Sequence, residues 1–156
     1  MAVISIYSTD EAIRQELYRL LHGLASESQE TLRLYCYDDF AAFLDSGREN
    51  PRRILLLAEK GAEGVELAVS AAEECPDNRL IWFSDLDFAL FSYRLEVVYF
   101  GFLPVQEESL RTALRNCKRR RGDSPSPMEP VIKEERPTIF QRLLRKLNRI
   151  MNLDPL

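Results

Sequence analysis

The sequence predicts an α/β protein built on a five-stranded parallel sheet in the order 2-1-3-4-5, with one more amphipathic helix at the C-terminus. Two observations carry this prediction. Five short apolar segments alternate with five segments of helical periodicity, and the connections between them are short. Residues 54–57 are an unbroken apolar run, which is typical of a central parallel strand buried on both faces. Right-handed crossovers then give a doubly wound sheet.

The first half of the chain supplies two strands and two helices. Residues 3–7 predict a strand, and the following helix is expected to end near Ala25. The apolar positions of that helix recur at helical spacing: Ile13, Leu17, Leu20, Leu21 and Leu24. Residues 31–37 alternate and predict the second strand. Asp38 is expected to cap a short helix that ends at Gly47.

The second half continues the same alternation. The expected elements are a strand at 54–57, a helix at 64–75, a strand at 80–83, a helix at 85–95, a strand at 99–103 and a helix from 106 to about 119. A loop is expected at 58–63, and Pro76 ends the third helix.

Charge divides the chain into two parts. Residues 1–117 carry 11 Lys and Arg against 20 Asp and Glu, a net charge of −9, whereas residues 118–156 carry 10 against 5, a net charge of +5. Four prolines between residues 122 and 137 indicate a linker. We therefore expect a domain at 1–121, a linker at 122–137 and an amphipathic helix at 138–152.

Composition also bears on the compartment. The three cysteines, Cys36, Cys75 and Cys117, are odd in number and widely spaced, which favours reduced thiols over a disulfide framework. No signal peptide and no transmembrane run is visible in the sequence. We expect a cytoplasmic protein, with membrane association through the C-terminal helix left open.

Two stretches resemble a known family. Residues 89–105, ALFSYRLEVVYFGFLPV, and residues 64–68, GVELA, are similar to the receiver domains of two-component response regulators, nearest to the type that precedes LytTR DNA-binding domains. The resemblance covers about residues 2–117 and implies a flavodoxin-like (CheY-like) fold. We expect no LytTR domain here, because the 39 residues after Cys117 are predicted to be mostly linker and a single helix.

The resemblance also implies a phosphorylation pocket, and this sequence departs from it. Receivers place an acidic pair after strand one, a phosphate-accepting aspartate at the end of strand three, a hydroxyl at the end of strand four and a lysine before the proline of strand five. The corresponding residues here are Ser8 and Thr9, then Leu57 or Ala58, then Ser84, and finally Leu103 before Pro104. Only the hydroxyl and the proline are retained, so we expect a degenerate pocket without Mg²⁺.

Two acids stand near enough to replace the missing ones. Asp10 or Glu59 would enter the pocket if an element were displaced by one or two residues. The simpler interpretation makes Asp10 a first-turn helix residue and Glu59 a solvated loop acid, and we adopt it as the expectation.

No other chemistry is indicated. His22 is the only histidine and has no acidic or cysteine neighbour at ligand spacing. Nucleotide-binding glycine motifs and a nucleophile elbow around Ser84 are lacking. We expect no catalytic residues, no metal, no cofactor and no enzymatic activity.

Two surfaces are candidates for partner binding. Phe88, Phe91 and Tyr93 lie on a helix that is apolar on nearly every side, and they either pack in the core or contribute to a dimer or partner interface. Leu143, Leu147 and Ile150 follow the apolar face of the C-terminal helix, opposite a basic face. That helix would fold back on the domain, pair with its copy, dock on another protein or lie on an anionic membrane. Nucleic acid is disfavoured because aromatic residues do not interleave the basic run.

These observations favour a non-catalytic, phosphorylation-independent adaptor that acts by protein–protein contact in bacterial signalling. Two alternatives stay open: a phosphorylatable regulator that uses a displaced acid, and a peripheral membrane protein anchored by the C-terminal helix.

Overall fold

A computed structural model describes residues 1–118 of the chain. Its five strands form one parallel sheet in the order β2-β1-β3-β4-β5, as the sequence predicts. The strands are β1 (Ala2–Tyr7), β2 (Leu32–Tyr37), β3 (Ile54–Ala58), β4 (Arg79–Ser84) and β5 (Tyr99–Phe102). The helices between and after them are α1 (Glu11–Ser28), α2 (Phe40–Glu49), α3 (Glu63–Glu74), α4 (Ala89–Arg94) and α5 (Glu107–Cys117).

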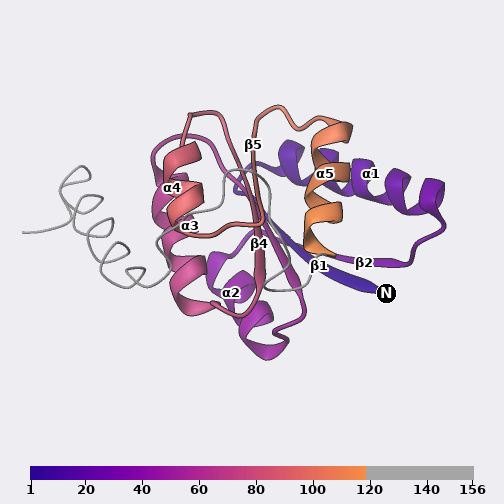
Figure 1. Ribbon diagram of the computed structural model, residues 1–156, viewed down its shortest axis with the longest axis horizontal. Helices are drawn as coiled ribbons and strands as arrows, with labels where there is room; N and C mark the ends of the chain where they lie inside the picture. Colours follow the sequence, from indigo (N-terminus) through magenta and orange to yellow (C-terminus); the bar gives the residue numbers. More distant parts are fainter. Residues whose placement is uncertain (119–156) are drawn as a thin grey trace, which may run out of the picture.

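Helices cover both faces of the sheet. Figure 1 shows α3 and α4 on one side of the sheet and α1 and α5 on the other. All five residues of β3 are buried because that strand pairs with β1 and β4 and lies under helices on both faces. The apolar run at 54–57 is therefore the centre of the molecule, as predicted.

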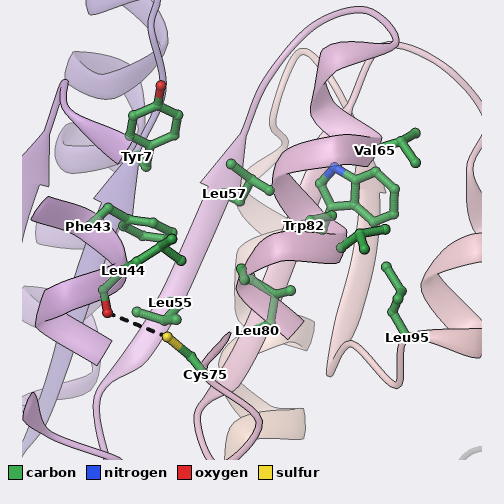
Figure 2. Packing of buried hydrophobic residues seen from close by; sticks show 13 residues of the cluster. Tyr7, Phe43, Leu44, Leu55, Leu57, Val65, Cys75, Leu80, Trp82 and Leu95 are labelled. Atoms are coloured by element: carbon green, nitrogen blue, oxygen red, sulfur yellow. Dashed lines mark hydrogen bonds between the residues drawn. The ribbon is translucent and has the colours of Figure 1, made fainter. Parts of the chain in front are cut away.

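Two hydrophobic clusters follow from this layering. The cluster under α2, α3 and α4 includes Phe43, Leu55, Leu57 and Trp82, and Figure 2 shows Trp82 with Leu57 on one side and Val65 on the other. The cluster under α1 and α5 is built on Ile4, Leu56 and Phe83 and their neighbours. Successive strand residues point to opposite faces, so the clusters take alternate residues of β3.

The helix α2 differs from the expectation at both ends. Its N-cap is Asp39, whose carboxylate accepts a hydrogen bond from the Ala41 amide at 3.3 Å, and not Asp38. The helix also continues past Gly47 to Glu49. A Cβ at Gly47 would lie 3.0 Å from Leu55 Cδ1 and 3.1 Å from Cys75 Sγ. Glycine at this position lets α2 pack closely on β3 and does not end the helix.

Two other helices differ in length. The first, α1, runs one turn beyond Ala25 and ends at Gln29, a left-handed residue with φ of 58°. The fourth, α4, was expected from residue 85 and begins only at Ala89. The Ser84 hydroxyl accepts from the Leu86 amide and the Asp87 carboxylate accepts from the Ala89 amide. These local bonds hold residues 85–88 as a turn in place of a helix.

Candidate functional site at the carboxyl edge of the sheet

The predicted pocket residues do meet at one edge of the sheet. Parallel register places the ends of β1, β3 and β4 side by side, with Tyr7 opposite Leu57 and Ala58 opposite Phe83. Ser84 lies opposite Phe102, and the Leu103 amide donates to the Ser84 carbonyl at 2.9 Å. Ser8, Thr9, Ala58, Ser84, Leu103 and Pro104 therefore share the edge at which open α/β sheets bind ligands. β3 ends at Ala58, one residue beyond Leu57.

Glu59 is not the solvated loop acid that we expected. It is 5% exposed, and its two carboxylate oxygens accept hydrogen bonds from Thr9: the hydroxyl at 2.7 Å and the amide at 3.2 Å. The Glu59 amide donates to the Phe83 carbonyl, which extends the β3–β4 pairing by one residue and turns the side chain inward. The carboxyl edge thus holds a buried carboxylate, Glu59, that is hydrogen-bonded to Thr9, the second residue after β1.

The other polar groups at this edge serve local structure. Ser8 is fully buried, and its hydroxyl accepts from the Asp10 amide at 3.1 Å. Asp10 is the N-cap of α1 and accepts from the Ala12 amide at 2.9 Å, which agrees with the expected role in the first helical turn. Asp85 accepts from the Gly61 amide at 2.8 Å. Ser8 and Asp10 thus stabilise the start of α1, whereas Asp85 joins the connection after β4 to the connection after β3.

The carboxylates of this edge affect the pKa of Tyr7, which lies at the end of β1. Burial raises the pKa of its phenol, and the nearby carboxylates of Glu59 and Asp39 raise it further. Within residues 1–118, no group of three or more His, Cys, Asp or Glu side chains has the arrangement of a metal site.

The aromatic residues of α4 are divided between the core and the surface. Phe88 stacks on the buried Trp82 with a centroid distance of 5.5 Å, and Phe91 meets Phe88 edge-on at 6.1 Å. Both pack against the cluster under α2, α3 and α4. Tyr93 is half-buried, with the Arg94 guanidinium 6.0 Å from its ring centroid. Phe88 and Phe91 thus fit the core interpretation better than the interface interpretation.

The apolar residues that are exposed on and near α4 are not the ones that the sequence predicts for partner binding. Leu86 is 43% exposed, Leu90 is 67% exposed and Phe102 is 54% exposed. Phe102 lies on β5, which pairs only with β4 in the described sheet. We call Leu86, Leu90 and Phe102 the α4–β5 patch. The sequence signal for Leu90 was its place on the outer side of an apolar helix, opposite the residues that pack inward.

Leu143, Leu147 and Ile150, the predicted tail contacts, lie outside the described residues. In the part that the structure does describe, no helix is both long and apolar enough to cross a membrane.

Known structures share this fold. A response regulator receiver domain from Clostridium thermocellum is 18% identical, with a TM-score of 0.61 over 78% of this chain and 98% of that one. A CheY-like response regulator from Mesorhizobium loti is 18% identical, with a TM-score of 0.56 over 75% and 98%. The structure described as FixJ-N is 15% identical, with a TM-score of 0.61 over 81% and 98%. Comparison of the sequence with family models and with curated proteins gave no match. The chain has the fold of receiver domains.

Proposed function

We propose that this chain is a receiver-like adaptor that acts by protein–protein contact in bacterial signalling, without phosphoryl transfer. The observation that carries the proposal is the set of side chains at the carboxyl edge of the sheet. Hydroxyls stand after β1 at Ser8 and Thr9, a methyl group ends β3 at Ala58, and a hydrocarbon side chain precedes Pro104 at Leu103.

The chemistry of those groups supports this function. Mg²⁺ prefers carboxylate oxygens in near-octahedral geometry, which hydroxyls and a methyl group do not provide. An acyl-phosphate needs a carboxylate at the acceptor position, where Ala58 stands. A bound phosphate needs a cation beside it, and Leu103 supplies none. The fold is kept while the groups that would do the chemistry are replaced.

The α4–β5 patch supports a contact surface. Its three exposed side chains are apolar, and β5 presents an edge without a partner strand in the described sheet. A protein partner or a second copy of the chain would cover both features at once.

Labelling with acetyl phosphate and Mg²⁺ tests the first half of the proposal. We expect intact-mass spectrometry of the full chain to show no phosphoryl adduct, while an active receiver treated in parallel is labelled. An adduct that maps to residues 8–10 or 58–60 overturns the adaptor function.

Light scattering tests the second half. If the α4–β5 patch pairs two copies, Leu90→Glu converts a dimer to a monomer, because a charge placed in the interface would be desolvated. Glu73→Lys, at an exposed position of α3, is the matched control and leaves the dimer intact. A wild-type monomer directs the search to a different protein as the partner of this patch.

A phosphorylatable regulator is the second candidate, and the burial of Glu59 favours it. This carboxylate lies one residue beyond β3, inside the edge and not in solvent. If it accepts phosphate, the wild-type chain is labelled and Glu59→Gln is not, while Asp10→Asn keeps the label. The membrane alternative rests on residues 138–152, and co-sedimentation with anionic vesicles that is lost in Leu143→Glu would support it.

A further inference from the structure

An open pocket of about 480 Å³ lies at the carboxyl edge, between the start of α1 and the connection from β5 to α5. Apolar side chains from both segments line it: Ala12, Ile13, Leu17, Leu103, Pro104 and Val105. Its charged lining comes from Asp10, Glu16 and Asp85, with Lys60 as the single cation. A pocket of this size and lining holds several aliphatic side chains.

The surroundings of the pocket are strongly acidic. Each of the five connections between the end of a strand and the second residue of the next helix carries two acids. They are Asp10, Glu11, Asp38, Asp39, Glu59, Glu63, Asp85, Asp87, Glu107 and Glu108. The same connections contain one base, Lys60. Carboxyl ends of parallel strands meet at one edge, so these charges add in a single field that attracts a cationic segment.

The chain itself contains a segment that complements this surface. Residues 138–152 carry Arg142, Arg145, Lys146 and Arg149 and no acid. Apolar residues recur at helical spacing on the other side: Ile139, Leu143, Leu147 and Ile150. An apolar floor with an acidic rim matches such a segment in both respects.

The connection is long enough. The described chain ends at Lys118, at the far end of α5 from the pocket, and α5 has 11 residues, which gives a length of about 16 Å. Nineteen residues, 119–137, separate Lys118 from this segment. A flexible chain of that length has a root-mean-square span of about 24 Å and an extended one reaches about 60 Å. A tether of this length keeps the segment at a millimolar effective concentration near the pocket.

We propose that residues 138–152 bind in this pocket of their own chain, with apolar side chains on the floor and the basic residues against the acidic rim. Bound there, the segment covers Lys60, Asp85 and Leu103, and it is withheld from other partners until a competitor displaces it. The inference goes beyond the proposed function because it assigns an internal ligand to a surface distinct from the α4–β5 patch.

Hydrogen–deuterium exchange of the full chain tests the proposal. Wild type is compared with the double variant Leu143→Glu/Leu147→Glu, which keeps the domain sequence unchanged. We expect peptides covering 11–17 and 103–108 to take up deuterium several-fold faster in the variant, and peptides covering β2 to be unaffected. Equal uptake at 11–17 and 103–108 in the two proteins overturns the proposal, as does a difference confined to the α4–β5 patch.

The charge component has its own test. Glu16→Lys on the rim should raise exchange at 103–108, and Glu49→Lys, which changes the net charge equally at an exposed site on α2, should not. Adding Arg145→Glu to Glu16→Lys should restore part of the protection. Equal effects of the two lysine variants contradict binding at this pocket. Protection that increases with protein concentration would show that a second copy supplies the segment, and it overturns the intrachain assignment.

Discussion

Among single residues, the contact between Glu59 and Thr9 distinguishes the candidate site. It joins a buried carboxylate to a residue 50 positions away in the sequence. The hydroxyl and the amide of Thr9 both donate to it, so the contact joins the ends of β1 and β3. Hydrogen bonds to a charged group contribute more than neutral ones, because an unpaired buried charge is costly. This contact fixes the end of β3 relative to the end of β1.

Thr9→Val tests that contribution, since valine keeps the shape and removes the hydroxyl. We expect the free energy of unfolding to fall by about 1.5–3 kcal/mol, measured by urea denaturation. Thr112→Val is the control: its hydroxyl donates to the Glu108 carbonyl on an exposed turn of α5, and its loss should cost less than about 0.5 kcal/mol. Similar costs at the two sites would mean that the bond to Glu59 adds no stability.

The burial of Glu59 could not be predicted from the sequence. Nothing in the local sequence Ala58-Glu59-Lys60 separates an inward acid from a solvated one. The direction of the side chain is set by the pairing of Glu59 with Phe83 and by the position of Thr9, both remote in the chain. By contrast, the capping role of Asp10 could be predicted, because it depends on Ala12 alone.

Cys117 shows how burial shifts the pKa of a thiol, even against the opposing effect of the Arg79 charge. Desolvation raises the pKa of its thiol from 9.0 to about 12. Above pH 9 the unfolded chain loses this proton and the folded chain keeps it, so stability falls as pH rises from about 9 to about 12. We expect Cys117→Ala to reduce the slope of stability against pH in that window by up to about 1.4 kcal/mol per pH unit.

Urea denaturation at several alkaline pH values measures the slope. Comparison with the wild-type chain removes the effect of other groups that titrate there. Cys36→Ala, at an exposed thiol, is the control and should change the slope less. Identical slopes for wild type and Cys117→Ala would contradict the assignment.

At the scale of elements, the alternation of five strands and five helices was predictable because each has a local signature. β3 is an unbroken apolar run, and α1 and α5 carry apolar residues at helical spacing. The errors arose where two local signals compete. At residues 85–88 helical periodicity competes with the hydrogen bonds that the Ser84 and Asp87 side chains accept, and the turn prevails. At Gly47 a helix-ending residue serves instead for close packing on Leu55.

Phe88, the N-cap of the short helix α4, contacts the sheet by stacking on Trp82. Its ring lies at 10° to the plane of Trp82, the only tryptophan of the chain. We expect Phe88→Ala to cost about 2–3 kcal/mol, below the range of about 3–5 kcal/mol for a fully buried aromatic, because Phe88 is half-buried. Fluorescence emission of Trp82 should shift to longer wavelength as water reaches the indole.

Leu90→Ala is the matched control on the same helix. Leu90 is 67% exposed, so its truncation should cost less than about 0.5 kcal/mol and leave the emission unchanged. A cost at Leu90 equal to that at Phe88 would show that Leu90 is covered in solution, which would agree with an interface at the α4–β5 patch.

At the scale of the whole molecule, the apolar core and the acidic edge occupy different parts of the fold. Two apolar clusters, one on each face of the sheet, hold β1, β3 and β4 in the centre. The acidic connections all lie at the carboxyl edge, and of their acids only Glu59 is buried. The packing of the sheet therefore does not depend on which side chains occupy that edge, so the edge can vary while the fold is kept.

Native-state hydrogen exchange should reproduce this division. Amides of β3 are paired on both sides and buried under helices on both faces, so they should exchange only through global unfolding, with a free energy equal to that from urea denaturation. β2 is an edge strand with several exposed residues, and we expect its unpaired amides to exchange at least tenfold faster. Nuclear magnetic resonance resolves the two strands residue by residue.

Two outcomes would change the interpretation of the sheet edges. If the amides of β5, the other edge strand, exchange as slowly as those of β3 at high protein concentration and faster on dilution, a second copy covers that edge. If β2 is as slow as β3 at every concentration, the assignment of β2 as a free edge is wrong.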